Sequence, residues 1–206
     1  GRNLEKFDFS IPQGNIGEAW VIAAHDNGSS KITNGDLKGL TLKEAYEKQP
    51  TLFTEKVYDK FPLLIKILDA SDNLSVQVHP EDDYARENEN GELGKTECWY
   101  VLDVKEGTKL VYGHTAKTKE EFNDKIDREQ WQELFIEEEV KAGDFFYIPA
   151  GTLHAIGEGI LIYEVQQNSD TTYRVYDYDR VDKDGNKREL HIEKTKDVTK
   201  VPFEKV

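Results

Sequence analysis

The sequence predicts a mainly β domain, a small barrel of strands with a few short helices on its outside. Three features indicate this fold. Residues 74–79 alternate apolar and polar side chains at the period of two that a strand with two different faces requires. Residues 160–165 and 171–178 are rich in β-branched and aromatic side chains. Residues 143–154 contain a turn, a short apolar run, a second turn and then a histidine.

Length and composition fit one soluble domain. The chain has no linker rich in Gly, Ser or Pro, so we expect a single domain over residues 1–206. No apolar run approaches the ~20 residues of a membrane helix and no signal sequence begins the chain, which predicts a cytoplasmic protein without a membrane partner. The formal net charge of −14 predicts no nucleic-acid partner, because such binding neutralises phosphates with Lys and Arg. The oligomeric state is not predicted.

The first third of the chain is expected to form a strand, a ribbon and a helix. The apolar run 19–24 suits a strand that is buried on both faces. Two Asn-Gly pairs tolerate the positive φ of tight turns, so residues 20–34 are expected to form a β-ribbon. Thr41 and Glu44 form a capping box, which predicts a short helix ending near Gln49.

Two further strands carry charged residues. The apolar run 63–68 is a predicted strand with a lysine, Lys66, in its middle. The predicted strand 95–102 places alternate side chains on one side, namely Lys95, Glu97 and Trp99. Residues 81–92 are acidic and are expected to form a helix or a solvated loop.

The remaining elements are expected on the periphery. Thr118 and Glu121 form a second capping box, and the apolar residues up to Phe135 predict two short amphipathic helices packed on the barrel. Asp184-Gly185 predicts a turn that leads into a hairpin arm over residues 189–193.

The polar faces of three predicted strands indicate one enclosed metal site. The ligand candidates offer two imidazole nitrogens and two oxygen donors: Gln77, His79, Glu97 and His154. Zinc takes such ligands, and so do manganese, iron and cobalt. The only cysteine, Cys98, excludes a cysteine-based zinc site. Each candidate alone fits an ordinary core or surface side chain, so only their combination favours a metal.

The spacing before His154 resembles a signature of the cupins. Residues 143–154 follow Gly-x5-Pro-x-Gly-x2-His, which is similar to the second motif of these double-stranded β-helix (jelly-roll) barrels. The resemblance implies a cupin fold in which His154 binds the metal. The alternative is a hairpin that ends in a surface histidine.

Longer motifs resemble one family of cupins, the type I phosphomannose isomerases. The likeness runs from about Gly17 to Glu193, and its most specific segments are 75–80, 94–100, 149–156 and 166–180. It implies an enzyme that interconverts mannose 6-phosphate and fructose 6-phosphate with one zinc ion per chain. Members of the family begin before Gly1 and continue past Val206 into a small β domain, so we expect both parts to be absent here.

The resemblance also implies roles for single residues. It places the zinc ligands at Gln77, His79, Glu97 and His154. It places the catalytic arginine at Arg174, with Lys95 as a second catalytic candidate. It places Lys66 and Ser75, together with Lys95, in the pocket for the sugar phosphate.

The reaction explains why such residues are needed. Moving a proton between C1 and C2 passes through an enediolate, so the site needs positive charge and a base. Zinc and Arg174 supply the charge, and Lys66 and Lys95 suit phosphate or a developing oxyanion. By strand alternation Arg174 is expected to share its face with Tyr176. The sequence does not identify the base.

Several alternatives stay open at this point. Arg174 could instead be a structural ion-pair partner of Asp177 or Asp179. Two histidines and a carboxylate also form the triad of a cupin Fe(II) oxygenase, although Gln77 would fill a position that such a site leaves for oxygen. A sugar-binding cupin without catalysis is the third possibility, because the two ends of the family are expected to be absent.

Overall fold

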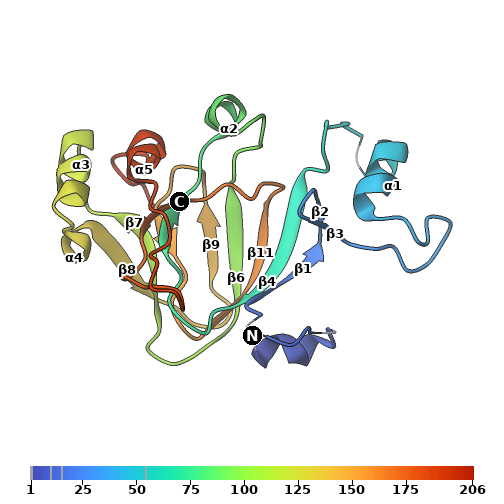
Figure 1. The fold of residues 1–206 in the computed structure, drawn as a ribbon, viewed down its shortest axis with the longest axis horizontal. Coiled ribbons are helices and arrows are strands. Elements are labelled where there is room, and N and C mark those ends of the chain that lie inside the picture. The colour runs from blue at the N-terminus through green and yellow to red at the C-terminus, as the bar shows by residue number, and fades with distance from the viewer. Residues whose placement is uncertain (1, 10, 15, 54) are drawn as a thin grey trace.

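The computed structural model describes residues 2–9, 11–14, 16–53 and 55–206. Within this part of the chain, two five-stranded antiparallel sheets face each other as an open barrel (Figure 1). The first sheet has the order β1-β4-β11-β6-β9, and the second has the order β12-β5-β10-β7-β8. The fold is therefore mainly β, as the sequence predicted.

Each sheet draws its strands from distant parts of the sequence. The strands are β1 Glu18–Ile22, β2 Ala24–His25, β3 Gly28–Ser29, β4 Leu63–Asp69, β5 Val76–Val78, β6 Glu97–Val104, β7 Lys109–His114, β8 Phe135–Glu139, β9 Phe145–Ile148, β10 His154–Ala155, β11 Ile160–Gln167 and β12 Tyr173–Tyr176. The helices are η1 Arg2–Phe7, α1 Leu42–Lys48, η2 Pro50–Leu52, α2 Asp82–Asn88, α3 Lys119–Asp127, α4 Trp131–Leu134 and α5 Ile192–Val198. Among the described residues, no helix is both long and apolar enough to cross a membrane.

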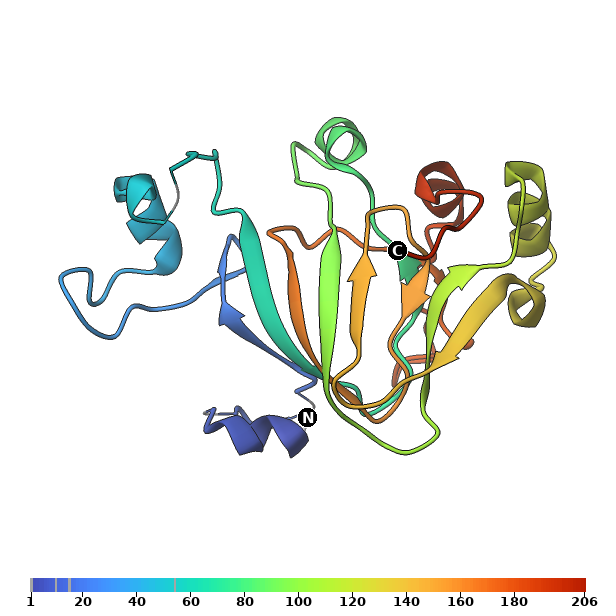
Figure 2. The same ribbon diagram turned by 180° about the vertical axis from the view of Figure 1, so that it is seen from behind.

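Three apolar clusters hold the barrel together. The first lies between the sheets and includes Trp99, Tyr112 and Ile162. The second covers the outer face of the second sheet, where α3, α4 and α5 pack, and it includes Phe122. The third covers the outer face of the first sheet beneath η1 and includes Leu4. Figure 2 shows α3 and α4 at one end of the molecule and α1 at the other. The interior cluster fills only part of the space between the sheets, so polar side chains can line the rest.

The capping boxes differ in how completely they form. At α1 the Thr41 hydroxyl accepts from the Glu44 backbone N–H, and the Glu44 carboxylate accepts from the Thr41 backbone N–H. The first box is confirmed. At α3 the Thr118 hydroxyl accepts from Glu121, but the Glu121 carboxylate accepts from the N–H of Lys117, outside the cap. Only half of the second box is present.

Three predictions about strands are wrong or only partly confirmed. Residues 189–193 do not form a hairpin arm, because α5 begins at Ile192 and buries Thr195 and Thr199 at helical spacing against the barrel. The ribbon over residues 20–34 is limited to β2 and β3, since β1 pairs with β4 instead. As an edge strand, β1 is only half-buried rather than enclosed on both faces.

Two glycines, one before β9 and one before β10, should differ in the unfolding free energy that is lost when each is replaced by alanine. Gly143 and Gly151 both have positive φ, 95° and 86°, but only at Gly151 would a Cβ meet other atoms, Lys200 Cγ at 2.8 Å and the Val198 carbonyl oxygen at 3.0 Å. Gly143→Ala should cost about 1–2 kcal/mol of unfolding free energy for the left-handed backbone alone. Gly151→Ala should cost a further ~1–3 kcal/mol for the forced contact. Equal losses in urea unfolding would contradict the close approach of α5 to the turn at Gly151.

Candidate metal centre and substrate pocket

Strand register places polar side chains in one row on the inner face of the second sheet. Gln77 in β5 lies opposite His154 in β10 and opposite Arg174 in β12. Residues directly opposite each other in antiparallel strands project to the same face. The neighbours Val76 and Val78 point outward into the cluster under the helices. Alternation along β5 therefore brings Gln77 to the inside of the barrel beside His154.

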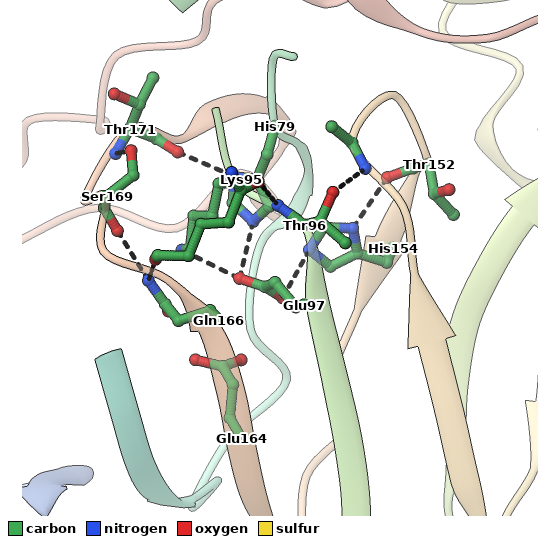
Figure 3. Close-up of polar contacts among 12 residues, drawn as sticks. His79, Lys95, Thr96, Glu97, Thr152, His154, Glu164, Gln166, Ser169 and Thr171 are labelled. Atoms are coloured by element: carbon green, nitrogen blue, oxygen red, sulfur yellow. Dashed lines mark hydrogen bonds and ion pairs between the residues drawn. The ribbon is translucent and has the colours of Figure 1, made fainter. Parts of the chain in front are cut away.

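Three of the predicted ligands converge at the top of this space. The candidate ligand atoms of His79, Glu97 and His154 all lie within 4.8 Å of one another (Figure 3). His79 Nε2 is 3.3 Å from Glu97 Oε1, and His154 Nε2 is 3.7 Å from Glu97 Oε2. All three residues are buried. The structure thus brings together residues that are 75 positions apart in the chain.

Backbone carbonyls set the orientation of both imidazole rings. His79 Nδ1 lies 2.9 Å from the Thr171 carbonyl oxygen, and His154 Nδ1 lies 2.8 Å from the Thr152 carbonyl oxygen. A carbonyl oxygen only accepts, so each Nδ1 carries the proton and each Nε2 keeps a lone pair. Both lone pairs face the Glu97 carboxylate.

These lone pairs fit a bound cation. Neither His79 Nε2 nor His154 Nε2 has a hydrogen-bond partner among the described residues, although both atoms are buried. The two imidazole lone pairs and the Glu97 carboxylate are all hydrogen-bond acceptors. Burying them together is unfavourable unless a positive charge lies between them. Two nitrogens and a carboxylate, with the Gln77 amide oxygen on the same face, form a donor set that a zinc ion accepts.

Electrostatics favours the ligand form of each side chain. Burial, with the nearby charge of Lys95, lowers the pKa of His79 to about 3, and burial also lowers the pKa of His154. Burial alone would raise the pKa of Glu97, but the Lys95 ammonium group at 3.1 Å brings it well below its ordinary value. At neutral pH the cluster is therefore two neutral imidazoles and one carboxylate, the protonation states that metal binding needs.

Lys95 is a buried ammonium group beside this cluster. Burial opposes its charge, but Glu97 and Glu164 outweigh burial and raise its pKa. It therefore stays charged next to the candidate ligands, where it can meet an anionic oxygen of a ligand.

Glu164 is a site residue that sequence reasoning missed. It lies opposite Lys66 and Trp99 on the inner face of the first sheet, and its carboxyl group points toward the cluster (Figure 3). Trp99 Nε1 donates to Glu164 Oε2 at 2.8 Å and to Glu97 Oε2 at 3.2 Å. Burial and the charge of Glu97 raise the pKa of Glu164 to about 7. The sequence does contain a signal for Glu164, because it is a charged residue inside an apolar strand, as Lys66 is in β4.

Lys66 lies opposite Glu164 on the inner face of the first sheet. Its side chain is buried, and its Nζ lies 3.8 Å from Glu164 Oε1 and 3.8 Å from Glu18 Oε2. It also lies 5.3 Å from the centroid of the Trp20 ring, a cation–π contact. Lys66 is thus a buried cation at the open edge of the barrel, where β1 is the last strand.

Arg174 lies on the inner face of the second sheet, opposite Gln77, and contacts Ser75. Arg174 Nε donates to Ser75 Oγ at 3.1 Å. The alternative partner Asp177 instead pairs with two other arginines, and Asp179 pairs with Lys187. The ion pair that would make Arg174 structural is therefore not formed among the described residues.

The expectation that Arg174 shares its face with Tyr176 is wrong. The register of β12 shifts between these residues, so Arg174 lies opposite Gln77 whereas Tyr176 lies opposite Val76. Tyr176 consequently stacks on Trp131 of α4, on the outside of the barrel. The irregularity lets a single strand direct the arginine inward and the tyrosine outward.

The sequence of this chain is similar to that of known proteins. Residues 3–102 match the model of the catalytic domain of type I phosphomannose isomerases. Mannose-6-phosphate isomerase ManA of Bacillus subtilis (strain 168) is 55% identical over 202 residues, which are 98% of this chain. The chain is similar to type I phosphomannose isomerases along nearly its whole length. It spans 64% of the length of that relative.

Solved structures of phosphomannose isomerases share the architecture. The crystal structure of mannose 6-phosphate isomerase from Bacillus subtilis has a TM-score of 0.94 and 48% identity, and the match covers 99% of this chain and 65% of that one. A zinc-bound mannose 6-phosphate isomerase has a TM-score of 0.67 and 18% identity, over 90% of this chain and 66% of that one. The cupin barrel predicted from the sequence is confirmed.

Proposed function

We propose that the chain is the catalytic part of a zinc-dependent mannose-6-phosphate isomerase, which interconverts mannose 6-phosphate and fructose 6-phosphate. The observation that carries this proposal is the buried cluster of two neutral imidazoles and one carboxylate beside the cation Lys95, with the cation Arg174 opposite Gln77 on the same inner face. The identity to a mannose-6-phosphate isomerase of Bacillus subtilis supports the substrate.

The proposed zinc ligands are His79, Glu97, His154 and Gln77. Nitrogen and oxygen donors of this kind suit zinc, and a zinc-bound relative supports that choice of metal. When bound, the ion supplies a Lewis acid for the oxygens at C1 and C2, or acidifies a water. The proposed stoichiometry is one ion per chain.

The chain's own residues supply charge and a proton acceptor. Arg174 and Lys95 are cations that can stabilise the negative oxygen of the enediolate. Glu164, with a pKa of about 7, can both accept and donate a proton at neutral pH. We therefore propose Glu164 as the group that exchanges the proton between C1 and C2. Lys66 and Ser75 are proposed to contact the sugar phosphate.

An NMR assay tests this function. Mannose 6-phosphate is incubated in D2O with protein reconstituted with one equivalent of zinc. Signals of fructose 6-phosphate should appear, with deuterium entering at C1, because an enediolate exchanges its proton with solvent. Zinc binding without conversion would favour a sugar-binding protein, and oxygen consumption by the iron-loaded protein would favour the oxygenase.

Selectivity for the phosphate group is a further expected result. The net charge of −14 opposes any anion, so affinity for a sugar phosphate must come from local cations, including Lys66, Lys95 and Arg174. One charge-assisted hydrogen bond contributes about 1.5–3 kcal/mol, so mannose 6-phosphate should bind at least ~10-fold more tightly than mannose. Equal affinities in calorimetry would contradict the proposed pocket. A single domain over residues 1–206, a cytoplasmic location and the absence of nucleic-acid or membrane partners stay predictions.

A further inference from the structure

Arg174 is held by two segments that lie outside its own strand. Its Nε donates to Ser75 Oγ at 3.1 Å, and its Nη1 donates to the Glu189 carbonyl oxygen at 3.0 Å. Its backbone is tied to the second of these segments, since Arg174 N donates to His191 Nδ1 at 3.2 Å and Arg174 O accepts from His191 N at 2.7 Å. In the described part of the chain Nη2 makes no hydrogen bond or ion pair, so this end of the guanidinium can donate to a ligand.

Asp177 anchors the segment that contains Glu189. Its Oδ2 accepts from Arg188 Nε at 2.8 Å, and its Oδ1 accepts from Arg188 Nη2, so the two side chains meet side-on through two bonds. Arg188 directly precedes Glu189, whose carbonyl oxygen holds Arg174. A bidentate pair fixes orientation as well as distance, so it sets where that carbonyl oxygen points.

The same carboxylate anchors the segment that contains Ser75. Asp177 Oδ1 also accepts from Arg180 Nη2 at 2.5 Å, and Arg180 Nη1 donates to the Asn73 carbonyl oxygen at 2.6 Å. Asn73 is two residues before Ser75, the acceptor of Arg174 Nε. Both acceptors of the Arg174 guanidinium are thus tied, through one arginine each, to Asp177.

The surroundings of Asp177 suit such a hub. The residue is 5% exposed. Burial opposes its charge, but the bonds from Arg188 and Arg180 outweigh burial and lower its pKa, so the carboxylate is ionised. Tyr178 and Asp179 follow with φ of 56° and 54°, and Arg180 N donates to Asp177 O at 3.1 Å, as in a type I′ turn. Aspartate is common in this backbone but tyrosine is not, so at Tyr178 the turn is maintained against local strain.

We propose that Asp177 is a positioning residue of the isomerase, which fixes the two segments that hold the Arg174 guanidinium toward the sugar. The proposal rests on the proposed function, because it assumes that Arg174 meets the substrate. Without the carboxylate, Arg188 would lose its ion-pair partner while Arg180 would keep its pair with Asp72, and the charges of Arg174, Arg180 and Arg188 would repel one another more strongly. The segments that they hold would then move apart, and the guanidinium would lose its fixed place.

The test compares two aspartates of the same turn. Asp177→Asn keeps the shape of the side chain but removes the charge that both arginines need. Asp179→Asn is the matched control, because its pair with Lys187 joins two exposed side chains and reaches neither Arg188 nor Arg180. In the Asp177 variant kcat should fall by ~10-fold or more, toward the ~10²-fold that a misplacement of about 1 Å can cause. Zinc stoichiometry should stay unchanged, and the control should keep the wild-type kcat.

A double-mutant cycle separates positioning from a general structural role. In an Arg174→Ala background, Asp177→Asn should cause no further loss of kcat, because the residue through which it acts is already gone. A loss that multiplies with that of Arg174→Ala would overturn the proposal. Arg188→Ala is the second variant if Asp177→Asn does not fold, since the Arg188 side chain is 52% exposed, and Lys187→Ala is its control.

An NMR measurement that does not depend on turnover tests the positioning role of Asp177 separately from the proposed function. The ¹⁵N Nε–Hε signal of Arg174, assigned by its loss in Arg174→Ala, should shift and exchange faster with solvent in Asp177→Asn but not in Asp179→Asn. An unchanged signal would refute positioning even in an active enzyme. If the wild-type protein were inactive but the Arg174 signal still shifted in Asp177→Asn, the proposed function would be refuted and the positioning role of Asp177 would be supported.

Discussion

Replacing His79 by alanine is expected to abolish stoichiometric zinc binding. The change removes one of the two Nε2 lone pairs that converge on Glu97, so a bound ion would lose one direct ligand. Losing an outer-shell partner of a metal site typically reduces affinity by ~10–100-fold, so losing a direct ligand should reduce it further. Elemental analysis after zinc reconstitution and gel filtration measures the result.

His114 provides the matched control. It is another buried histidine, with Nε2 2.9 Å from the Lys200 carbonyl oxygen, and it lies outside the cluster of His79, Glu97 and His154. His114→Ala should lower the melting temperature but retain one zinc ion per chain. Stoichiometric zinc in the His79 variant, or its absence in the His114 variant, would mean that the cluster is not the metal site.

The pKa values of the cluster also predict how zinc affinity depends on pH. A solvent-exposed histidine would begin to lose a metal near its ordinary pKa of ~6.5. Burial lowers the pKa of His79 to about 3, so its proton competes with the metal only at much lower pH. Glu97 stays ionised over the same range because its pKa lies well below the ordinary value. Affinity measured by competition with a chelator of known proton affinity should therefore change little between pH 8 and pH 6, and a tenfold fall through pH 6.5 would contradict the neutral, buried imidazoles.

Replacing Arg174 by alanine is expected to reduce kcat by ~10²-fold or more, the usual effect of losing one preorganised donor to a developing oxyanion. The fixed guanidinium, with Nε on Ser75 and Nη1 on Glu189, presents its remaining donors to the pocket without any need for a tuned pKa. Arg174→Lys should not restore the rate, because an ammonium group lacks the planar fork. Zinc content should stay at one per chain.

The stability of the Arg174 variant distinguishes catalysis from structure. The side chain makes two hydrogen bonds to neutral acceptors, so its loss should reduce unfolding free energy by at most ~2–3 kcal/mol. Arg128→Ala is a control at an exposed ion pair with Asp124, for which both kcat and stability should be nearly unchanged. A normal kcat with a much lower melting temperature would show that Arg174 has a structural role.

Local sequence patterns were enough to predict most of the strands and the ligand candidates. Alternation over residues 74–79 placed Gln77 and His79 on one face, and the spacing of residues 143–154 singled out His154. A strand period and a turn depend on neighbours within a few residues, so they can be recognised without knowledge of the fold. The same local reasoning failed at residues 189–193, where burial against the barrel favoured a helix.

Only the tertiary structure decided the chemical state and the surroundings of these residues. The pKa of Glu164 rises to about 7 because its carboxyl group is buried and because it lies near the charge of Glu97, which is far away in the sequence. The free Nε2 atom of His79 follows from a carbonyl oxygen that is 92 residues distant. The inward direction of Arg174 depends on a register shift in β12, and its anchoring by Asp177 depends on loops from two other parts of the chain. Burial, charge coupling and hydrogen-bond geometry arise between segments that only folding brings together, and no local pattern contains them.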